Sequence, residues 1–135
     1  MHLSSPWRYA AALACVAVLA SCAGQGSVEE GAAGDSARRF VTAQVQDVAS
    51  ACSMLAPKTL QEVGSEGPCA TVLGDSAPSS APRLQSVEVY GTNAIARFDA
   101  DTVFLARFRD GWRVTAARCQ PDGPQRPYQC KIQAG

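Results

Sequence analysis

Residues 94–117 read AIARFDADTVFLARFRDGWRVTAA, and this stretch decides the fold. Apolar residues recur in it at every second position, which is the period of a β-strand with one buried face. Asp110 and Gly111 lie between two such segments and predict a two-residue hairpin turn, because the favoured turn needs positive φ at both central positions. Residues 86–89 alternate in the same way, and residues 91–93 predict a looser turn of the same kind. The pattern predicts four consecutive strands in an antiparallel meander.

A helical period precedes the strands. Over residues 37–55 apolar side chains recur three and four positions apart, which predicts one long amphipathic helix. Asp35 or Ser36 can serve as its N-cap. Shorter helical segments are expected over residues 57–63 and 69–73.

Two segments are expected to lack a helix or a long strand. Residues 74–82 are rich in Ser, Pro, Gly and Ala and predict a loop. Residues 119–135 contain three prolines and can add at most a short edge strand over residues 128–132. The predicted fold class is therefore α+β, with a long N-terminal helix and short helices packed on a four-stranded antiparallel sheet.

An export signal is predicted at the start of the chain. Residues 10–20 form an unbroken apolar run after one positive charge, Arg8. This run is too short for a membrane-spanning helix, which needs about 20 apolar residues. The run leads into Leu19-Ala20-Ser21-Cys22, which resembles the lipobox of bacterial lipoproteins. The resemblance implies that residues 1–21 are a lipoprotein signal peptide and that Cys22 carries two acyl chains, enough for stable attachment. An ordinary secretory signal with a chance cysteine is the alternative.

The segment after the lipobox is expected to be a flexible tether. Residues 22–34 contain four glycines and no periodic apolar face. They predict a lipidated tether, followed by a single domain over residues 35–135. The anchored domain is expected on the extracytoplasmic face of the cell membrane.

Four cysteines remain when Cys15 is removed with the signal and Cys22 is assigned to lipid. An even number in a small exported domain predicts two disulfides, with three possible connectivities. Cys52–Cys69 with Cys119–Cys130 is the favoured pairing among Cys52, Cys69, Cys119 and Cys130. A four-thiolate metal site and a reactive redox pair are the alternatives, and both lack a CxxC spacing.

Composition limits the chemistry. The single histidine is His2, within the predicted signal, so catalysis and metal binding that depend on imidazole are excluded from the exported chain. The 12 basic and 12 acidic residues leave no basic excess for nucleic acid. No phosphate loop, nucleophile elbow or calcium loop occurs in the sequence. We therefore expect no catalytic residue, no metal site and no cofactor.

Aromatic residues are the candidates for a ligand pocket. They are interpreted either as core or as the lining of a cavity between helix and sheet, and they comprise Phe40, Phe98, Phe104, Phe108 and Trp112.

Charged residues of the strands have two interpretations of their own. Asp99 and Asp101 are the nearest approach to an acid and base pair, but their place beside a turn predicts that they face water. The strand charges are interpreted as cross-strand ion pairs on a solvated face, or as a partner-facing arginine patch, and they comprise Glu88, Arg97, Asp99, Arg107, Arg109 and Arg113.

The helix-then-meander order, with Gly111-Trp112-Arg113-Val114 opening a strand, resembles the NTF2-like (cystatin-like) α+β cone over about residues 35–118. The stretches 51–57 and 119–130 also resemble those of uncharacterised actinobacterial lipoproteins. The family's catalytic Asp/His pairs are missing. The lipobox, the disulfide framework and the missing catalytic groups predict a membrane-anchored, non-enzymatic binding or interaction module with an envelope protein or small ligand as partner. The alternatives are a ligand carrier or a histidine-independent enzyme that uses Asp99 with Tyr90, and a purely structural envelope protein.

Overall fold

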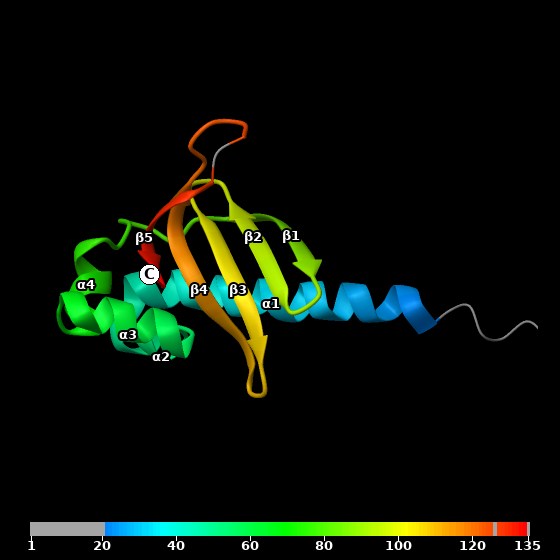
Figure 1. The fold of residues 1–135 in the computed structure, drawn as a ribbon, viewed down its shortest axis with the longest axis horizontal. Helices are drawn as coiled ribbons and strands as arrows, with labels where there is room; N and C mark the ends of the chain where they lie inside the picture. The colour runs from blue at the N-terminus through cyan, green and yellow to red at the C-terminus, as the bar shows by residue number, and fades with distance from the viewer. Residues whose placement is uncertain (1–20, 126, 135) are drawn as a thin grey trace, which may run out of the picture.

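The computed structural model describes residues 21–125 and 127–134, in which helices come first and strands second (Figure 1). The predicted signal peptide lies outside the described residues, except for Ser21. The predicted α+β class is confirmed. The helices are α1 (Ser21–Gln46), α2 (Val48–Ser53), α3 (Pro57–Glu66) and α4 (Cys69–Asp75), and the strands are β1 (Leu84–Tyr90), β2 (Asn93–Phe98), β3 (Thr102–Phe108), β4 (Gly111–Gln120) and β5 (Gln129–Gln133).

The strands form one antiparallel sheet in the order β1-β2-β3-β4-β5. Phe108 pairs with Gly111 and Tyr90 with Asn93, so a hairpin forms at each of the two predicted places. The prediction that Asp110 and Gly111 are the central residues of the first turn is wrong, because Arg109 and Asp110 connect the strands, Asp110 does not have positive φ and Gly111 begins β4. Gly111 has φ 118° and Gly91 has φ 59°, a region that glycine enters without the clash of a Cβ atom. The predicted count of four strands is wrong, because the proline-rich tail returns as β5 and pairs with β4.

Both favoured disulfides are confirmed. Cys52–Cys69 joins α2 to the start of α4 with Cα atoms 6.2 Å apart. Cys119–Cys130 joins β4 to β5 with Cα atoms 3.9 Å apart, and the two cysteines are also register partners in the sheet. The second bridge therefore holds the tail in register against β4, which accounts for the additional strand.

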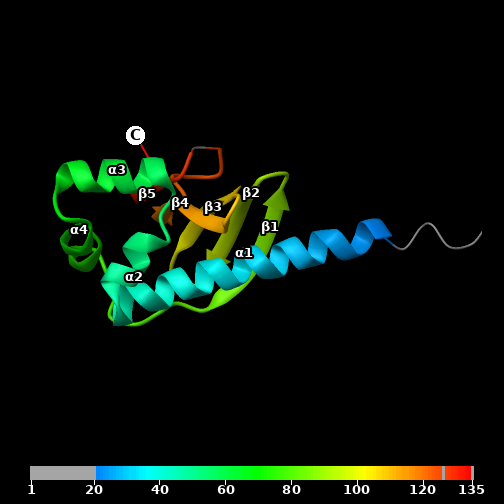
Figure 2. The same cartoon turned by 90° about the horizontal axis from the view of Figure 1, so that it is seen from below.

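Helix α1 covers one face of the sheet, while α2, α3 and α4 gather on the β4–β5 side (Figure 2). Ala37, Phe40 and Val41 on α1 are buried and contribute to a single apolar core with the facing strands. On β3 the core residues are Val103 and Leu105. We call this side of the sheet the helix face and the opposite side the outer face.

The single helix predicted over residues 37–55 is interrupted. Asp47 has φ −154° and ψ 84°, and its Oδ1 accepts a hydrogen bond from the Ser50 backbone N–H at 3.3 Å, which caps α2. The Ser50 hydroxyl also donates to this carboxylate, and that bond holds the pKa of Asp47 below its usual value. The prediction of one helix was wrong because a capping aspartate inside an apolar period ends one helix and begins another.

The flexible tether predicted over residues 22–34 is helical instead, and so is the expected N-cap at Asp35 or Ser36. Ala33 is fully buried, and a Cβ placed on Gly34 would lie 3.2 Å from Val87 Cγ2. The segment is thus packed against β1, which the glycine-rich sequence does not reveal.

The junction of α2 and α3 extends the sheet edge at β4. Leu55 forms a parallel bridge with Val114, where Ala56 N–H donates to Val114 O at 2.7 Å and Val114 N–H donates to Met54 O at 2.9 Å. Farther along, the buried Thr59 hydroxyl donates to Thr115 O at 2.9 Å. These bonds bring the end of α2 beside the first residues of β4.

Candidate functional site

Three of the five predicted pocket aromatics lie on the helix face. Phe40 has no exposed surface, and Phe98 and Trp112 are buried. All three belong to the apolar core between α1 and the sheet. Of the two interpretations offered by the sequence, their placement favours core packing.

The other two aromatics lie on the outer face. Phe104 pairs with Ile95, and its ring meets Tyr128 edge-on with centroids 5.1 Å apart. Phe108 is 40% exposed. The prediction that Phe104 and Phe108 belong to the core or line a cavity between helix and sheet is therefore wrong, because Val103 and Leu105 occupy the buried phase of β3. The five aromatics therefore do not line one pocket.

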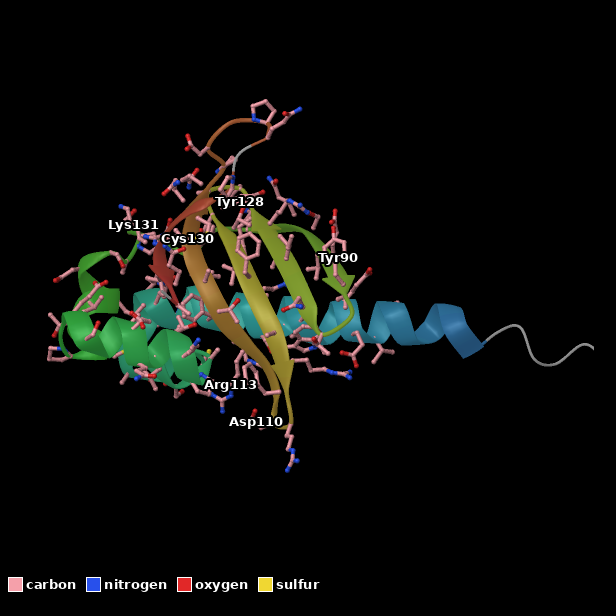
Figure 3. All side chains as sticks on the ribbon, in the orientation of Figure 1. Tyr90, Asp110, Arg113, Tyr128, Cys130 and Lys131 are labelled. Carbon is pink, nitrogen blue, oxygen red and sulfur yellow. A yellow bond between two sulfur atoms is a disulfide. The ribbon has the colours of Figure 1, made fainter. Side chains whose placement is uncertain are left out.

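A polar cluster occupies the outer face beside Tyr128 (Figure 3). Arg97 forms an ion pair with Glu88 at 3.1 Å, and the Tyr90 hydroxyl donates to the same carboxylate. The Tyr90 bond, followed by Arg97, lowers the pKa of Glu88, while the Glu88 acceptor raises the pKa of Tyr90. A hydrogen bond with Tyr128 raises the pKa of Arg97. These contacts confirm the predicted cross-strand pairing for Glu88 and Arg97.

Asp99 and Tyr90, the pair considered for a histidine-independent enzyme, are not brought together. Asp99 follows the end of β2 that pairs with Leu84, whereas Tyr90 ends β1 at the opposite end of that ladder. Asp99 Oδ1 accepts the Arg83 backbone N–H at 3.1 Å and so ties the preceding loop to the sheet.

Asp101 is buried, with 4% of its surface exposed, so the prediction that it faces water was wrong. Its Oδ1 accepts backbone N–H groups of Thr102 at 2.7 Å and Cys119 at 3.0 Å, while Oδ2 has no partner within the described part of the chain. Burial raises the pKa of Asp101. Arg118, beside Cys119, has φ 57° and sends its guanidinium to the Ser76 carbonyl. The Asp101 carboxylate therefore connects the β2–β3 turn to β4 beside Arg118, where the strand departs from regular geometry. This contact stabilises the fold.

A hollow of about 560 Å³ lies next to this corner, between the loop before β1 and the β2–β3 turn. Arg83, Asp99 and Arg118 line it. Asp99 and Arg118 already bond to the loop backbone, so two of these three charges hold the loop in place.

The second hollow, of about 150 Å³, lies where α1, the end of α2 and the start of β4 meet. We call it the Trp112 groove. Its lining residues come from three segments far apart in the sequence, and they are Ser36, Arg39, Ser53, Met54, Asp110, Trp112, Arg113 and Val114.

Arg113 lines the Trp112 groove and is held in place by several hydrogen bonds. Its guanidinium pairs with Asp110 across the hairpin turn and donates to the carbonyls of Ser53 at 2.9 Å and Leu55 at 3.4 Å (Figure 3). The mutual hydrogen bonding lowers the pKa of Asp110 and raises the pKa of Arg113. The positive charge of Arg113 is therefore already paired with Asp110 in the free protein.

Trp112 is held by a residue of the segment that was predicted to be a tether. Its Nε1–H donates to Glu29 Oε2 at 3.2 Å, and Arg107 lies 2.9 Å from the other oxygen of Glu29. Arg107 and Trp112 are register partners on neighbouring strands. The sequence analysis interpreted Arg107 as part of a solvated strand face or a partner-facing patch, whereas the structure pairs it with Glu29 of α1.

Arg39 differs from the other charges of the groove. The one bond of its guanidinium within the described residues is to the Ser36 hydroxyl oxygen at 3.1 Å, without a carboxylate. Neighbouring Arg38, in contrast, pairs with Asp35 at 2.7 Å.

The sequence signalled only part of this groove. Trp112 and Arg113 were named as candidates, whereas Ser36, Arg39 and Met54 were not. Their convergence depends on the Leu55 bridge to β4 and on the exact phase of α1, neither of which a local pattern contains. Within the described residues there is no group of three or more Cys, Asp or Glu side chains placed to hold a metal ion.

No described helix is long and apolar enough to cross a membrane. No family model, no curated protein and no solved structure matches the chain.

Proposed function

We propose that the protein is a lipid-anchored, extracytoplasmic binding module that acts without catalysis. The lipobox-like residues 19–22 support the anchor, with Cys22 as the lipidated residue. The two disulfides are compatible with an extracytoplasmic location. The proposed partner is an envelope protein or a small ligand, together with the membrane through the anchor, and not nucleic acid.

The observation that carries the binding role is the Trp112 groove. Three segments of the chain converge there, and Arg113 has its charge satisfied internally. Of the two arginines that line the groove, Arg39 is the one without a carboxylate partner among the described residues. A concave site with a few convergent polar groups is the usual form of a ligand site.

The finer fold assignment belongs to this proposal. A long helix packed on an antiparallel sheet with helices at one edge supports an NTF2-like cone. Of the alternatives, a small-ligand carrier is favoured by the same groove, whereas the Asp99 and Tyr90 enzyme loses its support because the two side chains lie at opposite ends of β1 and β2.

Anchoring is tested by expressing the full chain in bacteria supplied with labelled palmitate. We expect wild-type protein in the membrane fraction with label incorporated. Cys22→Ser should lose both label and membrane association, while Cys15→Ser, in the predicted signal, should retain both. A labelled C22S variant, or an unlabelled wild type, would contradict the anchor.

The binding role is tested by native mass spectrometry of protein gently extracted from its membrane. A bound protein supports the interaction module, and a bound small molecule supports the carrier. Turnover of a substrate that disappears on substitution of one polar residue would contradict a non-enzymatic role.

A further inference from the structure

Arg39 is presented to the Trp112 groove together with a second donor. The Ser36 oxygen accepts from the Arg39 guanidinium, which leaves the Ser36 hydroxyl proton available. Both residues lie on α1, one turn apart, and both line the groove. A guanidinium fork and a hydroxyl can together donate to the two oxygens of one carboxylate.

The surrounding charge selects a monoanion. The charged residues that line the groove are Arg39, Arg113 and Asp110. Glu29, which accepts from the Trp112 indole nearby, is already paired with Arg107. Arg113 is paired with Asp110, so one cation remains for a ligand. The single unpaired guanidinium matches one negative charge, whereas a dianion such as a phosphate monoester would keep a second charge without a counterion in the groove, which disfavours it.

The rest of the groove has a mixed lining. Met54, Trp112 and Val114 provide its apolar part, beside Ser53, Asp110 and Arg113. Its volume of about 150 Å³ is comparable with that of a cavity that holds a benzene ring. A ligand of this size would place its ring or aliphatic group against Met54 and the 8% of Trp112 that remains exposed, and its charge at Arg39.

We propose that the Trp112 groove binds the carboxylate of a monoanionic ligand with an apolar body, supplied by a small free acid or by the C-terminus of a partner chain. This inference rests on the proposed role as a binding module and names the chemistry that its site recognises.

Trp112 itself reports binding. The chain has two tryptophans, and Trp7→Phe leaves Trp112 alone. The full chain carrying this change is purified in detergent and titrated with sodium benzoate while tryptophan fluorescence is recorded. Benzamide, which has the same ring without the charge, is the matched ligand control.

We expect saturable binding of benzoate with an affinity in the millimolar range, and weaker binding of benzamide. Arg39→Gln should weaken benzoate binding by about tenfold or more, because it removes the positive charge and the charge-assisted hydrogen bond to the carboxylate. Arg38→Gln removes the neighbouring arginine, which is paired with Asp35, and should leave the affinity unchanged.

Two peptides with a C-terminal leucine, one with a free carboxylate and one amidated, distinguish the source of the carboxylate. Competition with benzoate by the free peptide alone supports a chain terminus, and competition by neither supports a small acid. Absent binding of benzoate, equal binding of benzamide, or an R39Q variant that binds like wild type would overturn the inference. The C22S experiment reads anchoring independently, so loss of the groove's ligand is distinguishable from failure of the proposed function.

Discussion

The two halves of α1 are helical for different reasons. In the half from residue 35 to 46, Ala37, Phe40 and Val41 are buried at helical spacing, so the local pattern and the tertiary packing agree. In the half from residue 21 to 34, Val28 is 68% exposed and four glycines lie within the helix. We call residues 35–46 the packed half and residues 21–34 the glycine-rich half. The packed half is specified by its own sequence, whereas the glycine-rich half depends on the residues that it contacts.

The energetics of the glycine-rich half explain how it can be helical at all. Each glycine costs about 0.5–1 kcal/mol relative to alanine in a helix interior. Extending an existing helix avoids the unfavourable nucleation step, so residues before 35 can propagate from the packed half. Glu29 bonds Trp112 and Arg107, and Ala33 is buried, which offsets the glycines.

The packed half should respond most strongly to substitution. Phe40→Ala removes a fully buried ring from the core and should lower the free energy of unfolding by about 3–5 kcal/mol. Val45→Ala, on the 38% exposed side of the same half, should lower it by well under that amount. Urea unfolding at equilibrium measures both. Similar losses for the two variants would contradict the assignment of the buried face.

The packed half also contains one buried polar side chain, the amide of Gln44. Gln44 lies on the buried stripe of α1, and neither its Oε1 nor its Nε2 has a hydrogen-bond partner within the described residues. Gln44→Leu replaces this amide with an apolar group of similar size. We expect the free energy of unfolding to rise by about 1–2 kcal/mol, because an unsatisfied buried polar group is unfavourable.

Gln44→Glu is the companion variant, since a carboxylate at the same site should be strongly destabilising if the site is apolar. A stability loss in Gln44→Leu would show that the amide has a partner, such as a bound water or ligand, and that the packed half includes a polar site.

Local patterns predicted the parts of this fold whose determinants are local. The Asp110-Gly111 hairpin follows from turn chemistry, and the pairing of Cys119 with Cys130 follows from closeness along the chain. The interruption at Asp47 was missed because its cap lies inside an otherwise continuous apolar period.

Determinants distant in sequence could not be recognised in this way. Glu29 is an ordinary surface glutamate in the sequence, and its role depends on Trp112, which lies on β4. Asp101 was expected in water, but a backbone N–H from Cys119 reaches it across the sheet. Arg39 belongs to a groove because Leu55 bridges to Val114. In each case the missing information is a contact between segments and not a property of one segment.

A substitution at Glu29 is the most direct way to release the glycine-rich half from the sheet. Glu29→Ala removes the acceptor of Trp112 and the partner of Arg107, and should lower the free energy of unfolding by about 1 kcal/mol, given the partial exposure of the ion pair. Amide hydrogen exchange should become faster over residues 26–34 and stay unchanged over residues 37–46.

Glu30→Ala is the matched control, because it changes the same residue type at the next, exposed position. Its exchange pattern should remain that of the wild type. Equal acceleration in both variants would show that residues 26–34 are helical by propagation alone and that Glu29 does not hold them.

The smallest effect gives the sharpest comparison, because it uses one substitution at two positions of the same half. Gly31→Ala adds a methyl group that meets nothing within 4 Å, so the free energy of unfolding should rise by about 0.5–1 kcal/mol. Gly34→Ala gains the same helix propensity, but its Cβ would lie 3.2 Å from Val87 Cγ2 and 3.4 Å from Leu84 Cδ2. These side chains must give way, so the net gain should be smaller than at Gly31 or reversed in sign.

The difference between the two alanine variants in urea unfolding isolates packing from propensity, since the propensity contribution is common to both. A smaller gain for G34A places α1 against β1 as far as Gly34. Equal gains would mean that Gly34 does not contact β1. The glycine-rich half would then be attached to the domain through Glu29 and the buried Ala33, without a contact at Gly34.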